Sequence, residues 1–296
     1  MRKRLGFVFM LGICLAIAAG TAAAQVYDVR LSGDQQSPPN DSEAVGHCLA
    51  YLNEAQDQLT VICEHDVENV TVAHIHEADQ PGGTGGVLLG FDSPVSPFKG
   101  IFSVTASDVQ KLNDGLLYVN VHSQDFPGGE IRGFIGPKSD AAVSFPLEPE
   151  QEVPPVDSGN SGICMGVLNP LGTVFTLGCS HDAADVNASH IHQGPEGVNG
   201  PPVFTLGAST TLFAQVHADS TFLPECYDFD DFLMDLGDRN LYVNVHAPGF
   251  APPSGVVRGQ IPPAPSVRYF SQFGNGEQAG ISISSSIVLM NTSTTS

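Results

Sequence analysis

The sequence LYVNVH occurs twice in this chain of 296 residues, at Leu117–His122 and again at Leu241–His246. Apolar and polar residues alternate within it, so Leu and the two Val share one face while Tyr, Asn and His share the other. This alternation is typical of a β-strand with one face against a core. The identical strand in two places indicates a duplicated β-domain.

The repeat extends well beyond this strand. Gly46–Ala78 aligns with Gly162–Gly194, and Arg132-Gly133 aligns with Arg258-Gly259, with extra residues in the middle of the second copy. Twelve of these 33 positions are identical, and they include Cys48 and Cys164, Cys63 and Cys179, His65 and His181, His74 and His190, and His76 and His192. We therefore expect a first domain over residues 25–137 and a second over residues 138–263.

Short β-branched or alternating runs punctuated by Gly, Pro, Asn and Asp fill the first copy. The pattern predicts an all-β fold of two tandem Greek-key sandwich or barrel domains, and the repeat argues against one large β-domain. Ser107–Asn113 is expected to form a helical turn capped by Ser107, and Gly82–Gly86 a flexible loop. The predicted strands are Tyr27–Leu31, Ala44–Leu52, Gln58–His65, Val70–His76, Gly100–Val104, Leu116–His122 and Glu130–Ile135.

The N-terminus has the pattern of a secretory signal peptide over residues 1–24. Basic residues at 2–4 precede an apolar run, Leu5–Ala19, and small residues follow at 22–24. A membrane anchor is the alternative, but the run is short for a span of about 20 residues. We expect a secreted, periplasmic or surface protein with no membrane span after cleavage. Residues 264–296 differ in composition and are expected to be a tail or a truncated β-module.

Charge excludes two classes of partner. The chain carries 32 acidic and 11 basic residues, with a formal net charge of −21. Binding to nucleic acid requires clustered Lys and Arg, and docking on anionic lipid also requires positive charge. The acidity of this chain therefore argues against both kinds of partner.

Cysteine spacing agrees with export, because an oxidising compartment converts pairs into disulfides. Cys48 and Cys63 are expected to lie across a hairpin, and Cys164 and Cys179 repeat the spacing. A thiolate metal site is the rival interpretation, although no CxxC is present. Cys226 has no counterpart and is either a free thiol or an intermolecular link.

The histidines carry the chemistry. In His74-Ile75-His76 both imidazoles share one face of a strand, and His122 lies on the polar face of LYVNVH. If the two strands are neighbours, three nitrogen ligands converge, and imidazole suits copper or zinc. The second copy repeats the set as His190, His192 and His246. The alternative is that these residues simply form hydrogen bonds on a sandwich surface.

Four other histidines are weaker candidates. His65 and His181 occupy matching positions in the repeat. The alternative is that each is only the last residue of a strand, next to an Asp. His47 and His217 are unmatched and are expected to be structural or surface residues.

Arg132 and Arg258 stand at matching positions in a chain with few basic residues. Each is expected either to pair with a nearby carboxylate or to act as a cation near the His cluster that attracts an anion. No sequence motif of a serine hydrolase, a zinc protease, a P-loop or a Rossmann fold is present, so no catalytic residue is assigned.

The motifs resemble those of the CHRD (chordin) domain family. They are AHIHEADQPGGTGGVLL at Ala73–Leu89 with LYVNVH and GGEIRG, and SHIHQGPEGVNGPPV at Ser189–Val203 with LYVNVH and GVVRG. The resemblance covers nearly all of the chain between the signal peptide and Ile261. It implies extracellular β-domains, often repeated, with a poorly defined biochemical role.

A fainter similarity is to copper-zinc superoxide dismutase. It implies that His74, His76 and His122 are copper ligands and that Arg132 guides an anionic substrate. No His occurs between His76 and His122, so the bridging ligand and zinc loop of that family are missing.

Three hypotheses follow from these observations. The first is an exported binding protein with a copper or zinc site in each domain and an extracellular protein as a further partner. The second is a dismutase-like copper enzyme. The third is a structural or adhesive surface module that binds no metal.

Overall fold

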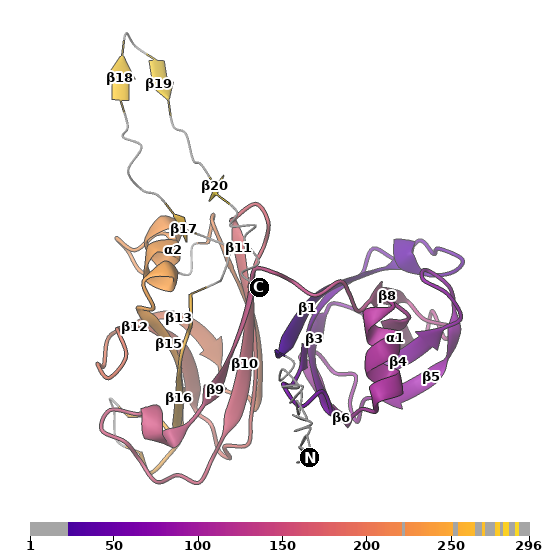
Figure 1. Cartoon of the computed structure of the whole chain (residues 1–296), viewed down its shortest axis with the longest axis horizontal. Helices are drawn as coiled ribbons and strands as arrows, with labels where there is room; N and C mark the ends of the chain where they lie inside the picture. The colour runs from indigo at the N-terminus through magenta and orange to yellow at the C-terminus, as the bar shows by residue number, and fades with distance from the viewer. Residues whose placement is uncertain are drawn as a thin grey trace, which may run out of the picture.

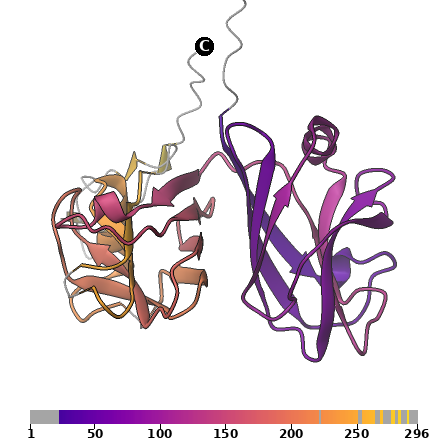
Figure 2. The ribbon, with the colours of Figure 1, turned by 90° about the horizontal axis from the view of Figure 1, so that it is seen from below.

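The computed structural model describes residues 23–220, 223–250 and 254–263, together with four short strands in the C-terminal segment. These strands are β17 (Arg268–Tyr269), β18 (Gly276–Gln278), β19 (Ile281–Ile283) and β20 (Val288–Leu289). The expected signal peptide falls almost entirely outside the described residues, and so does most of the expected tail. Figures 1 and 2 show two β-domains side by side, joined by a short linker.

The first domain is one eight-stranded antiparallel sheet that curves around its core. Its strand order is β5-β4-β7-β8-β1-β2-β3-β6, so β4 pairs with β7 rather than with β3. Helix α1 (Ala106–Asn113) contributes Val109 and Leu112 to the core. The strands are β1 (Gln25–Ser32), β2 (Val45–Leu52), β3 (Gln58–His65), β4 (Val70–Ala78), β5 (Gly85–Gly90), β6 (Phe98–Ser103), β7 (Leu117–Ser123) and β8 (Ile131–Phe134).

The second domain has the same arrangement in two four-stranded sheets, β14-β11-β10-β9 and β13-β12-β15-β16. An isolated bridge between Glu148 and Arg258 connects them, where Ser32 pairs with Arg132 in the first domain. Helix α2 (Phe229–Gly237) takes the place of α1. The strands are β9 (Ala142–Leu147), β10 (Gly162–Leu168), β11 (Val174–His181), β12 (Ala188–Gln193), β13 (Pro202–Gly207), β14 (Thr211–His217), β15 (Leu241–His246) and β16 (Val257–Gln260). The prediction of two all-β domains is confirmed.

Each domain contains one disulfide across its central hairpin. Cys48 on β2 pairs directly opposite Cys63 on β3, and Cys164 on β10 opposite Cys179 on β11. Closing a loop of this length stabilises a domain by about 3 kcal/mol in the chain-entropy model. The predicted pairing is confirmed, while Cys226 is exposed and free.

Two local predictions were wrong. Thr105, not Ser107, caps α1: its hydroxyl accepts from the backbone N–H of Asp108, whose side chain accepts from the N–H of Thr105. The segment expected to be a flexible loop instead enters a strand, because β5 begins at Gly85. The Gly-rich strand β5 therefore forms the edge of the sheet beside β4, and β13 takes the same place beside β12.

The domains contact each other through the outer faces of their disulfide hairpins. Leu49 and Ile62 of the first domain form a buried apolar cluster with Met165 of the second. Beside this cluster, the Lys99 ammonium donates to the Ser180 hydroxyl at 2.8 Å and to the Thr210 carbonyl at 3.2 Å. Within the described residues, no helix is long and apolar enough to cross a membrane.

Candidate metal centres

The first His cluster forms on the outer face of β4 and β7. These strands pair antiparallel, with His74 opposite Asn120 and His76 opposite Tyr118. Because side chains alternate, Ile75 enters the core while the flanking histidines face outward. One ligand nitrogen from each of His74, His76 and His122 lies within 4.8 Å of the other two.

The second domain builds the same cluster from β12 and β15. His190 lies opposite Asn244, and His192 opposite Tyr242. The nitrogens of His190, His192 and His246 also lie within 4.8 Å of one another. In the described part of the chain, these two are the only groups of three or more His, Cys, Asp or Glu so arranged. The structure thus brings the histidines singled out from the sequence together in two groups of three, one in each domain.

The hydrogen bonds of the imidazoles leave nitrogens free inside each cluster. Nδ1 of His76 contacts the Gly85 carbonyl at 3.1 Å, and Nδ1 of His192 contacts the Gly200 carbonyl at 2.9 Å. A neutral imidazole that donates from Nδ1 presents a lone pair on Nε2. The buried nitrogens without a partner are His74 Nδ1, His76 Nε2 and His122 Nε2 in the first cluster, and His190 Nδ1 and His192 Nε2 in the second.

Unpaired buried nitrogens are costly, and native proteins satisfy most such groups. A metal ion coordinated by the three imidazoles would satisfy them at once. Imidazole ligands whose other nitrogen donates to a backbone carbonyl are typical of metal sites, because this bond fixes the tautomer and the ring orientation.

Burial also favours the unprotonated form of five of these imidazoles. Desolvation lowers the pKa of His74, His76, His190 and His246, and lowers the pKa of His192 to about 4. A second cause at His74, His76 and His192 is the positive charge that a neighbouring histidine would carry. Their lone pairs are therefore available for a metal at neutral pH.

A tyrosine and a glycine hold one histidine of each cluster in place. The Tyr118 ring stacks on His76 with centroids 5.0 Å apart, and its hydroxyl accepts from the Gly85 N–H at 3.4 Å. Tyr242 repeats both contacts with His192 and Gly200, at 5.0 and 3.0 Å. A Cβ on Gly85 would overlap the Glu77 carbonyl, so only glycine fits there. The sequence analysis missed these residues, although the Gly repeats in GGTGG and VNG were visible.

A family model for the CHRD domain matches residues 27–135 and again residues 143–261. The chain belongs to the CHRD domain family. No curated protein and no solved structure is similar enough to this chain to count as a match. The family and the two disulfides fit an extracellular protein, and each CHRD domain here contains one complete His cluster.

In both CHRD domains the conserved arginine of the repeat lies behind the tyrosine. The guanidinium carbon is 4.9 Å from the Tyr118 centroid for Arg132 and 3.5 Å from the Tyr242 centroid for Arg258. Arg132 donates to the carbonyls of Gln35, Gly82 and Gly83.

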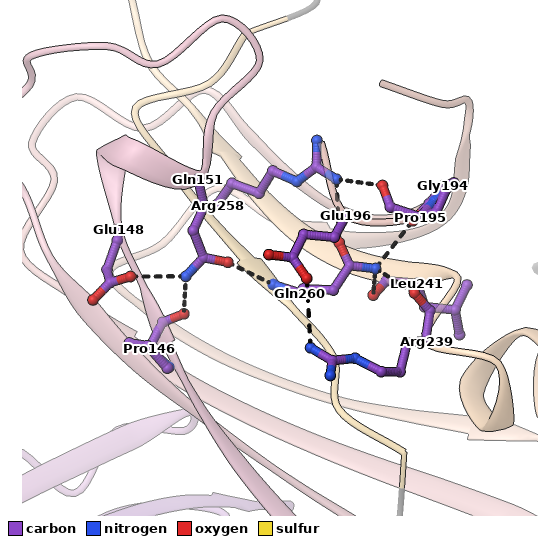
Figure 3. A network of polar contacts seen from close by, with 10 residues as sticks. All are labelled: Pro146, Glu148, Gln151, Gly194, Pro195, Glu196, Arg239, Leu241, Arg258 and Gln260. Carbon is purple, nitrogen blue, oxygen red and sulfur yellow. Dashed lines mark hydrogen bonds and ion pairs between the residues drawn. The ribbon is translucent and has the colours of Figure 1, made fainter. Parts of the chain in front are cut away.

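Arg258 donates to Pro195, Asn199 and Gln260, and Figure 3 shows it above Gln260 in this network. Arg132 and Arg258 are buried, with only 3% and 1% of each residue exposed. Each therefore fixes a loop over the sheet, and its position gives no support to the expectation that it attracts an anion from solvent.

The remaining histidines lie away from the clusters. Nε2 of His65 and of His181 contacts a loop carbonyl, Pro94 at 2.8 Å and Ser209 at 2.9 Å. His47 is buried and pairs with Asp28, and His217 is exposed. These contacts are structural, as expected for His47.

The two CHRD domains differ behind their clusters. Gln36 donates to Asn120 at 2.8 Å in the first domain. Glu152 takes the equivalent position in the second, where its Oε2 accepts from the Gly255 N–H at 2.9 Å and its other oxygen lies near the Asn244 amide. Burial raises the pKa of Glu152, so the carboxyl holds its proton more tightly than an exposed one.

Proposed function

We propose that this protein is an exported two-domain CHRD binding protein that binds one metal ion in each domain, and that it binds copper in preference to zinc. The observation that carries the proposal is the convergence of three imidazoles in both domains, with unpaired buried nitrogens directed into the cluster. Two copies of the domain have diverged at many positions, yet both keep this constellation.

The ligand set selects the class of metal. Three neutral nitrogen donors suit copper and zinc, whereas Ca²⁺ and Mg²⁺ require oxygen ligands. The three-His group contains no carboxylate and no thiolate. Copper binds nitrogen sites more tightly than zinc in the Irving–Williams order, which favours copper.

Three protein ligands leave a coordination position for water or another ligand. Each cluster has at least one half-buried residue at the outer face of its sheet, His74 in the first domain and both His190 and His246 in the second. A bound ion would thus be reached from outside the protein, as a carrier or a binding module requires.

The test is metal analysis of the purified mature protein after loading with Cu²⁺ or Zn²⁺ and removal of loosely bound ions. We expect two equivalents in the wild type, one in His76→Ala or His192→Ala, and none in the double variant. His217→Ala is the matched control, because His217 is exposed and outside both clusters. Less than a tenth of an equivalent in the folded wild type would refute the proposal. A superoxide assay on the copper-loaded protein then separates binding from dismutase activity.

A further inference from the structure

A stack of three side chains in the first domain ends on one of the proposed metal ligands. The Arg132 guanidinium lies over the Tyr118 ring, with its carbon 4.9 Å from the ring centroid. The Tyr118 ring lies nearly parallel to the His76 ring, at an angle of 15° and with the two centroids 5.0 Å apart. Because β7 lies between β4 and β8 in the sheet, the tyrosine lies between the histidine and the arginine.

The same arginine holds the β4–β5 loop, which leads into the residue that orients this histidine. Arg132 donates to the Gly82 carbonyl at 3.3 Å and to the Gly83 carbonyl at 3.0 Å. Gly85 follows directly after this loop, and its carbonyl contacts Nδ1 of His76. Arg132 therefore contacts the ring that stacks on His76, and it also fixes the segment that supplies the carbonyl.

The second domain makes the same connections with different loop residues. Arg258 lies 3.5 Å from the Tyr242 centroid, and the Tyr242 ring stacks on His192 at an angle of 17°. Arg258 donates to the Pro195 carbonyl at 3.2 Å, as Figure 3 shows, and to the Asn199 side chain at 3.3 Å. The residue after Asn199 supplies the carbonyl that contacts Nδ1 of His192. The two loops differ in sequence, yet the link from the arginine to both supports of the histidine is present in each domain.

The charge of these arginines does not explain their position beside a cation site. A guanidinium keeps its positive charge in proteins, and this charge repels a bound cation. Its rigid planar set of N–H donors is instead suited to hold a loop and an aromatic ring together. Electrostatic repulsion and positioning therefore predict opposite changes in metal affinity when the arginine is removed.

We propose that Arg132 and Arg258 are positioning residues of the two metal sites, and that each acts through the tyrosine and the loop that hold His76 or His192. This inference rests on the proposed metal binding and names the residues that fix the ligand geometry of the same sites. Without the guanidinium the three histidines are still present, but the supported imidazole is free to rotate, which weakens metal binding.

The experiment measures Zn²⁺ affinity by competition titration at one site at a time. His192→Ala isolates the first site, and His76→Ala isolates the second. All proteins also carry Cys226→Ser, because an exposed free thiol is itself a metal ligand. Arg132→Met and Arg258→Met should each weaken Zn²⁺ binding at their own site by about 10- to 100-fold, the range typical of residues that orient a ligand. Repulsion alone would give the opposite result, tighter binding after loss of the positive charge.

Two other arginines provide matched controls, Arg30→Met in the first domain and Arg239→Met in the second. Their side chains are 53% and 55% exposed, and Arg239 contacts the β12–β13 loop through Glu196. Each control removes one positive charge and should bind Zn²⁺ within about twofold of its parent. Arg132→Lys and Arg258→Lys keep the charge but lose the fork of N–H donors, so both should also weaken Zn²⁺ binding.

A spectroscopic readout separates positioning from a loss of folding. With Cu²⁺ bound, the arginine variants should change the hyperfine splitting in the EPR spectrum, because rotation of one imidazole alters the coordination of the metal. Partial unfolding would lower the amount of bound copper and leave the spectrum of the remaining sites unchanged. A double-mutant cycle tests the path: if Arg258 acts through Tyr242, the loss in Arg258→Met with Tyr242→Leu should be much smaller than the product of the two single losses.

The inference is overturned if Arg132→Met or Arg258→Met binds Zn²⁺ as tightly as its parent or more tightly, or if the Cu²⁺ spectrum does not change. Losses at Arg258 and Tyr242 that simply multiply would also overturn it. If a Met variant does not fold by circular dichroism, the Lys variant at that position decides by the same affinity and spectrum. Failure of the parent proteins to bind Zn²⁺ and Cu²⁺ would instead refute the proposed metal binding itself.

Discussion

Gly85 and Gly86 are neighbours in β5, yet an added methyl group would affect them very differently. A Cβ on Gly85 would overlap the Glu77 carbonyl oxygen, whereas a Cβ on Gly86 would meet no atom within 4 Å. The Gly85 carbonyl also orients His76 through Nδ1, at 3.1 Å. Gly85→Ala must therefore displace the backbone carbonyl that contacts His76, one of the proposed metal ligands, and Gly86→Ala leaves it in place.

The expected loss follows from the role of that carbonyl. Mutating a group that orients a metal ligand typically costs about 10- to 100-fold in metal affinity, or roughly 1.4–2.7 kcal/mol. We expect Gly85→Ala to weaken Cu²⁺ or Zn²⁺ binding at the first site by this factor. Because β5 is an edge strand and the core is untouched, the domain should still fold.

The assay is competition titration in a His192→Ala background, which leaves only the first site, with melting curves recorded in parallel. Gly86→Ala is the control and should bind within about twofold of the parent. The reasoning fails if both variants bind alike. It also fails if Gly85→Ala weakens binding only as far as it lowers the melting temperature.

Four further predictions concern pH and stability. Burial raises the pKa of Glu152 above its ordinary value of 4.5, so stability should fall as pH rises from that value toward the raised pKa; in denaturant titrations across pH, Glu152→Gln should remove this decline. His192 should give a pH dependence of stability with the opposite sign, because its pKa falls to about 4 in the folded protein without metal. Stability should therefore be lost on acidification from 6.5 toward 4, and urea titrations at several pH values should show a smaller loss in His192→Gln. Replacing Cys164 and Cys179 together with Ala should cost about 3 kcal/mol by chemical unfolding under oxidising conditions and nothing extra under reducing ones. Lys99→Met should lower the free energy of unfolding by about 1.5 kcal/mol through loss of its bonds to the second domain, and an unchanged calorimetric transition would contradict this.

The histidine clusters could be predicted from sequence because their geometry is largely local. Residues that are two positions apart on a strand have side chains on the same face. His74 and His76 therefore lie on one face in any fold that keeps this segment as a strand. Bringing His122 beside them required only the pairing of β4 with β7. The same three positions are histidine in both copies of the domain, and this repetition distinguished them from histidines that occur by chance.

The supporting residues depend on contacts that no local pattern encodes. Gly85 is required because a loop returns against the Glu77 carbonyl, and Arg132 is buried because three loop carbonyls cover it. Strand β5 was missed because its glycines favour a loop on their own, and pairing with β4 overrides that preference. The cap of α1 was misplaced because both Thr105 and Ser107 are good capping residues, and Thr105 is the one that forms a capping box with Asp108.

The face between the domains has a consequence for the origin of the chain. Leu49 and Met165 are equivalent residues of the two copies, as are Ile62 and Gly178, and each pair meets across this face. Contact between equivalent strands is the arrangement of an isologous, twofold-symmetric dimer. The tandem chain thus has the architecture of a homodimer whose subunits became joined end to end. A domain produced alone would leave this apolar surface uncovered and should pair with a second copy of itself.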